Sequence, residues 1–111
     1  MPPTRSFAAV LALGAALVAV PARAEDRTVA LKVAEDGFSP SEIEAPSGAR
    51  IRIEVTNATP VAIEFESFEL NRERVVQPGQ TVNVYLSGLD AGRYEFFDDF
   101  HQQRRGVLVV K

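Results

Sequence analysis

The side chains best suited to chemistry lie in one short stretch, from Gly92 to Gly106. It reads G-R-Y-E-F-F-D-D-F-H-Q-Q-R-R-G and places Asp98, Asp99 and His101 close together. Asp98 and His101 are three positions apart, so in a loop both could reach one cation. Carboxylate oxygens with one imidazole suit Fe(II), Fe(III) or Mn(II) by ligand type, and such a set also binds Cu(II). We therefore interpret Asp98 and His101 as candidate metal ligands.

A second candidate pair is Glu64 and Glu66, within the segment Glu-Phe-Glu-Ser. Residues two apart in a strand share a face, so these two carboxylates point the same way. That face is opposite Ile63 and Phe65, and so points away from the core. We expect only one of the two glutamates to belong to the site, near the strand end, and the sequence does not settle which.

Each of these residues also has a purely structural interpretation. The two acids at positions 98–99 fit a turn at the end of a strand, and the histidine fits a surface residue bonded to a backbone carbonyl. The glutamates at positions 64 and 66 fit a solvated strand face. Arg104 and Arg105 are expected in a solvated loop, where they could also contact an acidic partner.

The elements that must position these residues are short strands. Apolar and polar residues alternate along them, and turn residues (Gly, Pro, Asn or Asp) separate them, with no helical period in between. We predict an all-β fold, a Greek-key β-sandwich of seven or eight strands. Phe38 is expected to plug one end of the core from a loop, and residues 67–74 to form an irregular crossing. The predicted strands cover residues 28–34, 42–45, 49–56, 61–68, 75–76, 81–87, 94–97 and 107–110.

The N-terminus has the pattern of a secretory signal peptide. Arg5 precedes an apolar run at residues 7–20, and Ala22-Arg23-Ala24 fits an A-x-A cleavage site. An apolar run of about 14 residues is too short to span a bilayer comfortably. We therefore predict a signal peptide at residues 1–24, one domain at residues 25–111, a periplasmic location and no membrane span after cleavage.

Charge and cysteine content exclude several function classes. All 15 acidic residues lie in residues 25–111, but only 10 of the 12 Lys and Arg, so the formal net charge there is −5. An acidic domain argues against a nucleic-acid partner, which needs a basic face. The chain has no cysteine, which excludes disulfides, thiolate metal ligands and cysteine nucleophiles.

The pattern Tyr-x-Phe-x-Asp-x-x-His, from Tyr94 to His101, resembles the last strand and ligand loop of the cupredoxins. The resemblance covers nearly all of residues 25–111, including Asn57-Ala58 and the Pro78-Gly79 turn. Asp98 stands where the family has its copper-binding cysteine, and His101 stands at the second histidine. It is the only histidine, and no methionine follows it. A type 1 copper site needs two histidines and a cysteine with a weak axial methionine, so this chain cannot build one.

Within the cupredoxins, the chain resembles the EfeO-type cupredoxin-like domains of bacterial periplasmic iron-uptake systems, on the segments Glu64–Ser67 and Asp98–His101. The resemblance implies a metal site at Asp98 and His101 with Glu64 or Glu66 nearby, and an iron or copper ion as cofactor. It also implies a membrane iron permease and a second periplasmic iron-binding protein as partners. Ferrous-iron oxidase activity is implied by the resemblance alone.

Two other functions remain open at this point. The same ligands would serve an envelope chaperone or buffer for Cu(II), with no enzymatic step. A sandwich that has lost its metal would instead be a docking module.

Overall fold

The computed structural model describes residue 3 and residues 26–111. Apart from residue 3, the predicted signal peptide lies outside these residues. In the described part no helix is long and apolar enough to cross a membrane. Its regular structure consists of nine strands: β1 (Arg27–Ala34), β2 (Gly37–Ser39), β3 (Glu42–Ala45), β4 (Arg50–Asn57), β5 (Ile63–Ser67), β6 (Arg72–Val76), β7 (Thr81–Ser87), β8 (Gly92–Asp98) and β9 (His101–Val110).

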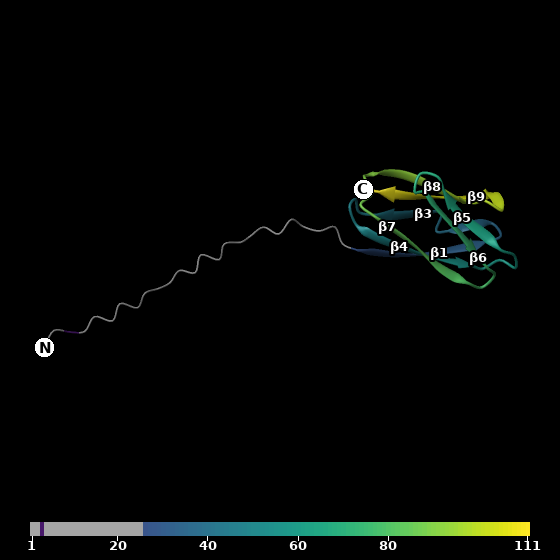
Figure 1. The fold of residues 1–111 in the computed structure, drawn as a ribbon, viewed down its shortest axis with the longest axis horizontal. Coiled ribbons are helices and arrows are strands. Elements are labelled where there is room, and N and C mark those ends of the chain that lie inside the picture. Colours follow the sequence, from purple (N-terminus) through teal and green to yellow (C-terminus); the bar gives the residue numbers. More distant parts are fainter. Residues whose placement is uncertain (1–2, 4–25) are drawn as a thin grey trace.

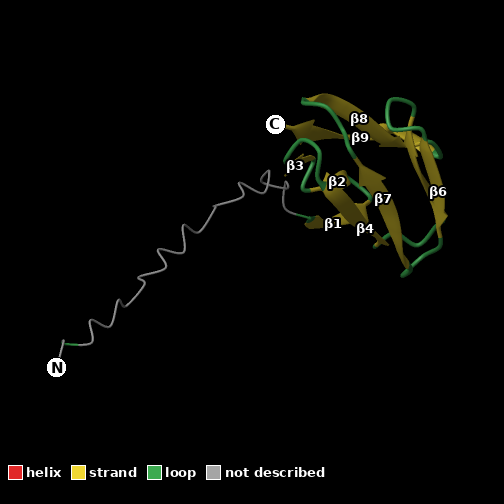
Figure 2. Ribbon diagram, turned by 60° about the vertical axis from the view of Figure 1, so that its left-hand side comes forward, coloured by secondary structure: helices red, strands yellow, loops and turns green. Residues whose placement is uncertain are grey.

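The strands form two sheets that pack as a sandwich (Figures 1 and 2). One sheet has the order β2-β1-β4-β7 and the other β3-β9-β8-β5-β6. β1 pairs with β4 and β3 with β9 in parallel, whereas the other pairings are antiparallel. The predicted all-β sandwich is therefore confirmed.

Alternating apolar residues from both sheets fill the space between them. Along β4, Ile51, Ile53 and Val55 are buried, as their period of two predicts. Phe38 is buried as well, and its ring meets the rings of Phe65 and Phe96 edge-on at centroid distances of 6.5 and 5.0 Å. Each fully buried side chain of this size contributes about 1.5–3 kcal/mol. Phe38 thus belongs to the core, as expected.

Two segments differ from the sequence-based expectation. Residues 72–76 form the regular strand β6, so the irregular part of the predicted crossing is confined to the turn before it, where Asn71 has a φ of 52°. Asparagine tolerates the left-handed conformation, which allows β5 and β6 to form a tight hairpin. The second difference is the short strand β2, which replaces a predicted loop.

The stretch from Asp98 to Gly106 was also expected to be an open loop. Instead β9 begins at His101, directly opposite Asp98, and only two residues connect it to β8. The register shifts between Phe97 and Asp98, which is the mark of a β-bulge. Bulges turn a side chain to a new direction and are frequent near functional sites.

Asn57 fixes the base of the β5–β6 hairpin. Its side chain is fully buried, and its Nδ2 donates to the carbonyls of Val61 (2.7 Å) and Val76 (2.9 Å). Its Oδ1 accepts hydrogen bonds from the backbone and the hydroxyl of Thr59. These bonds tie the entry to β5 to the exit from β6.

Candidate metal centre

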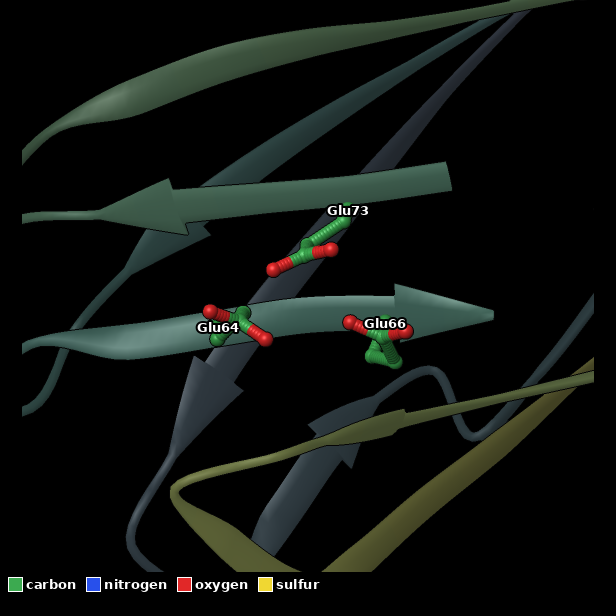
Figure 3. Close-up of side chains that lie close together, drawn as sticks. All are labelled: Glu64, Glu66 and Glu73. Atoms are coloured by element: carbon green, nitrogen blue, oxygen red, sulfur yellow. The ribbon is translucent and has the colours of Figure 1, made fainter. Parts of the chain in front are cut away.

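Three glutamates converge on the outer face of the β5–β6 hairpin. The antiparallel register pairs Glu66 with Glu73 and Glu64 with Val75. Because side chains alternate along a strand, all three glutamates lie on the face opposite the core residue Phe65. One carboxylate oxygen from each lies within 4.8 Å of those of the other two (Figure 3).

Glu64 is the member of this trio with the most unusual environment. Only 8% of the residue is exposed, although it lies on the outer face. Its pKa is raised to about 7, first because burial disfavours the carboxylate. A hydrogen bond to Glu66 and the charges of Glu73, Glu66 and Asp99 raise the pKa further. Near neutral pH Glu64 is therefore partly protonated.

No ion pair within residues 26–111 neutralises Glu64, Glu66 or Glu73. Crowded carboxylates without a cation repel one another, and a bound cation reverses the sign of that interaction. The arrangement is therefore chemically suited to a hard cation with oxygen ligands.

Asp98 has a different environment on the inner face of the same sheet. It pairs with Phe65 across the strands and is fully buried. Its Oδ1 accepts hydrogen bonds from the backbone N–H groups of Glu64 (3.0 Å) and Phe100 (3.1 Å). Its Oδ2 lies 2.9 Å from Nδ1 of His101 and accepts a bond from Nη1 of Arg104 at 3.0 Å. Four donors thus satisfy this carboxylate.

The imidazole of His101 is oriented by the Asp98 carboxylate. The bond at Nδ1 places the proton on that nitrogen in the neutral ring, which leaves Nε2 as an acceptor. Within residues 26–111 no hydrogen bond uses Nε2, and 31% of the side chain is exposed. A carboxylate that holds the far nitrogen of a histidine is a common support for a metal ligand. Nε2 is therefore the atom of His101 that could ligate.

The two arginines next to this pair lie differently from the solvated loop expected for them. Arg104 is buried, bonds Asp98 and donates from Nε to the carbonyl of Glu35 at 3.2 Å. Arg105 points to the other face and lies over the ring of Phe97, 5.2 Å from its centroid. The reason is that β9 begins at His101, so consecutive residues here alternate between the two faces of the sheet.

The structure brings the sequence-predicted residues together as two pairs. Asp98 contacts His101, and Glu64 lies beside Glu66, but the pairs point to opposite faces of the sheet. In the described part of the chain, the two glutamates with Glu73 form the one group of three or more metal-capable side chains at ligand spacing. The pairs are linked through the backbone, because the N–H of Asp99 also donates to the carbonyl of Glu64 at 2.9 Å.

Glu73 is the residue that sequence reasoning missed. It was assigned to the irregular segment, where its direction could not be inferred. The signal that could have placed it is Asn71, a turn residue between the alternating segment at residues 63–67 and the segment at residues 72–76 that contains Glu73. A hairpin closed there sets Glu73 opposite Glu66, as observed.

Comparison with known proteins agrees with this sandwich. Residues 7–110 match the family described as cupredoxin-like domain. The chain belongs to this family. Among curated proteins, an uncharacterized protein of Rickettsia prowazekii (strain Madrid E) is 37% identical over 83 residues, which cover 74% of this chain and 66% of that protein. The cupredoxin-like chain thus spans slightly less than two thirds of that relative's length.

Two solved structures illustrate the fold. The metal binding domain of the Cu(I)-exporting P-type ATPase CopA of Streptococcus pneumoniae D39 superposes with a TM-score of 0.69 at 18% identity, covering 81% of this chain and 98% of that one. A purple cupredoxin from Nitrosopumilus maritimus gives a TM-score of 0.59 at 18% identity, covering 75% and 99%. At this identity the similarity establishes the fold alone.

The residues of this cupredoxin-like domain do not fit a type 1 copper ion. The chain contains no cysteine and a single histidine. Asp98 stands where the cupredoxin resemblance places the copper-binding cysteine. Its carboxylate already contacts the Arg104 guanidinium and Nδ1 of His101. A permanent cation from the protein itself therefore neutralises the carboxylate in that place.

Proposed function

We propose that this cupredoxin-like domain binds Fe(II) in the periplasm through Glu64, Glu66 and Glu73. The observation that carries the proposal is the convergence of three carboxylates within 4.8 Å with no cation paired to them in residues 26–111. The raised pKa of Glu64 supports it, because a nearby cation would stabilise the ionised form that burial and the neighbouring carboxylates disfavour.

The ligand types favour iron over Cu(I). The Streptococcus pneumoniae domain was solved with Cu(I), a soft ion that prefers thiolates and thioethers. This chain has no cysteine, and its one methionine is Met1. Three carboxylates are hard ligands that suit Fe(II) or Mn(II), and they also accept Cu(II). A Cu(II) chaperone or buffer is therefore the second candidate, favoured by the accessible Nε2 of His101.

We place the protein in ferrous-iron uptake as an EfeO-type domain, on the strength of the sequence resemblance. In that role it hands iron to a membrane permease, alongside a second periplasmic iron-binding protein. Carboxylate ligands stabilise Fe(III) more than Fe(II), so the same site favours oxidation. One electron would leave each Fe(II) and pass to dioxygen, which is the oxidant in this proposal.

The Asp98–His101 pair is the alternative place for the ion. With Asp98 held by four donors, the ligand there would be Nε2 of His101, and Asp98 would position the ring. A single imidazole binds weakly by itself, which is why we place the ion at the glutamates.

The test is anaerobic titration calorimetry of the chain with Fe(II), Mn(II) and Cu(II). We expect one Fe(II) per chain, and Glu73→Gln should weaken binding by at least about tenfold, since even the partners of metal ligands typically contribute about 10–100-fold. Glu42→Gln is the matched control, because Glu42 is an exposed glutamate of the same sheet outside the trio. Admission of air then shows whether the bound iron is oxidised faster than iron in buffer.

Three results would count against the proposal. Loss of binding in His101→Ala but not in Glu73→Gln would move the ion to the histidine. A strong preference for Cu(II), with iron uptake unchanged in a deletion strain, would favour the copper buffer. No binding of any of the three ions at micromolar concentration would favour a metal-free docking module.

A further inference from the structure

A small hollow opens on the outer face of the five-stranded sheet, next to the glutamate trio. Its volume is about 200 Å³, below the roughly 300–1,000 Å³ typical of small-molecule pockets. The hollow is thus large enough for one side chain of a partner protein. Two aromatic rings, three carboxylates and one guanidinium line it, from Phe68, Phe97, Glu69, Glu95, Asp99 and Arg105.

Phe68 is the most exposed large apolar side chain of the described residues, at 78%. It lies in the turn directly after β5, and its ring packs on the buried ring of Phe97 with a centroid distance of 5.4 Å. The ring below holds Phe68 in place while its outer face meets solvent. Aromatic residues held in this way are typical anchors of protein interfaces.

The same hollow already holds one guanidinium. Arg105 lies over the ring of Phe97 at 5.2 Å, within the distance at which a cation is attracted to an aromatic face. The carboxylates of Glu69, Glu95 and Asp99 outnumber this one cation. The hollow therefore has the chemistry to receive a second cationic side chain.

The charges on the whole outer face of the five-stranded sheet also favour a cationic partner. Its outward strand positions carry six glutamates against two arginines, Arg93 and Arg105. The outer face of the other sheet is slightly basic, with Lys32, Arg50 and Arg52 against Glu54 and against Asp26, which pairs with Arg50 at 2.8 Å. The six glutamates of the acidic face are Glu42, Glu44, Glu64, Glu66, Glu73 and Glu95.

We propose that the acidic face is a docking surface for a basic segment of another protein, anchored at Phe68. An apolar residue of the partner packs on Phe68, and a neighbouring arginine or lysine enters the hollow between Phe68 and the carboxylates. The partner is selected by charge complementarity and its register is set by the aromatic anchor. The proposal goes beyond metal binding, and it needs no metal for its test.

The probe is a capped peptide of alternating leucine and arginine, titrated into the 15N-labelled chain without metal. We expect amide shifts to concentrate around Phe68, Phe97 and Gln102, which also lines the hollow. The affinity should fall as salt is raised. Phe68→Ala should weaken binding about tenfold, as for an interface anchor. Glu95→Gln should weaken it less and should flatten its salt dependence.

Tyr85→Ala is the matched control, because Tyr85 is an exposed aromatic residue on the basic face. It should change the affinity less than twofold, and a leucine–glutamate peptide should not bind. Equal weakening by Tyr85→Ala, or shifts spread over all the glutamates without focus, would overturn the proposal. So would concentration-dependent self-association that Arg52→Glu abolishes, since the acidic face would then be covered by a second copy.

Discussion

The Oδ2 atom of Asp98 lies 3.0 Å from Nη1 of Arg104, and both side chains are buried at the end of the sandwich. This ion pair stands at the position where the cupredoxin resemblance places a copper-binding cysteine. The guanidinium neutralises the carboxylate from inside the protein. The consequence is that the Asp98 carboxylate has a structural role at this end of the domain, since donors of the protein itself already satisfy it.

Breaking this ion pair should be costly. In Arg104→Met the apolar stem is kept, but the charge of Asp98 stays buried with one partner fewer. Removal of one member of a buried pair typically costs about 3–5 kcal/mol. We expect a loss of that order in urea unfolding. Arg105→Met is the control, since Arg105 is exposed and contacts one ring, and it should cost less than about 1 kcal/mol. Similar losses in the two variants would contradict the assignment.

Gly106 should not tolerate a side chain. A Cβ there would overlap Cε2 of Phe96, whose ring is buried and stacked on Phe65 at 5.2 Å. Overpacking of this kind costs about 1–3 kcal/mol. We expect Gly106→Ala to lower the thermal midpoint. Gly92→Ala, whose Cβ would meet Tyr94 at an ordinary 3.7 Å, should change it little.

The double variant Gly106→Ala with Phe96→Leu tests whether the Phe96 ring causes the clash. Leucine is smaller than phenylalanine and has no ring. The leucine would cost stability alone, but in the double variant it relieves the clash. The two losses should therefore add to more than the loss of the double variant. Strict additivity would show that Phe96 is not what excludes the side chain.

The sandwich could be predicted because its strands alternate with a period of two. This rule assigns Ile51, Ile53 and Val55 to the core, and they are buried. Phe38 is buried as expected too, because a large apolar ring gains from leaving water, although its segment forms the strand β2 and not a loop. The alternation of apolar and polar residues depends on the strand itself, so it predicts the buried face without knowledge of the neighbouring strands.

The site was harder because it depends on register between strands. The sequence indicates that Glu64 and Glu66 share a face, but Glu73 joins them only through the hairpin closed at Asn71. The burial of Arg104 likewise follows from the early start of β9, which the polar residues at 101–105 conceal. Alternation predicts faces, whereas the pairing of strands decides which faces meet.

The stability of the protein should depend on Glu64 in a specific pH range. Glu64 titrates near 4.5 in the unfolded chain and at about 7 in the folded chain. Between these values the folded chain holds more protons, so the free energy of unfolding falls as pH rises and levels off above 7. The total change should be on the order of 1–3 kcal/mol. It should be absent from Glu64→Gln, measured as the difference between the two urea-unfolding curves from pH 4 to 8.

Glu44 offers a control of opposite sign. Its pKa is lowered by the hydrogen bond and the charge of Lys111. The contribution of this exposed pair is therefore present above the ordinary pKa of 4.5 and is lost as pH falls below it. Glu44→Gln should leave the slope between pH 5 and 7 unchanged. If it removed that slope as Glu64→Gln does, the slope would not come from the glutamate trio.

The last prediction joins the titration of Glu64 to metal binding. Because Glu64 holds a proton below about pH 7, an entering cation must displace it. Mn(II) is a suitable probe, since it prefers oxygen ligands and does not oxidise as readily as Fe(II). The Mn(II) affinity, followed by electron paramagnetic resonance, should rise about tenfold per pH unit from pH 5 to 7 and then level off. In Glu64→Gln no such proton is released, so binding should be weaker at pH 8 and nearly independent of pH. Two results together would place the ion at His101 instead of the glutamates. The pH dependence of Mn(II) binding would be unchanged in Glu64→Gln, and it would be lost in His101→Ala.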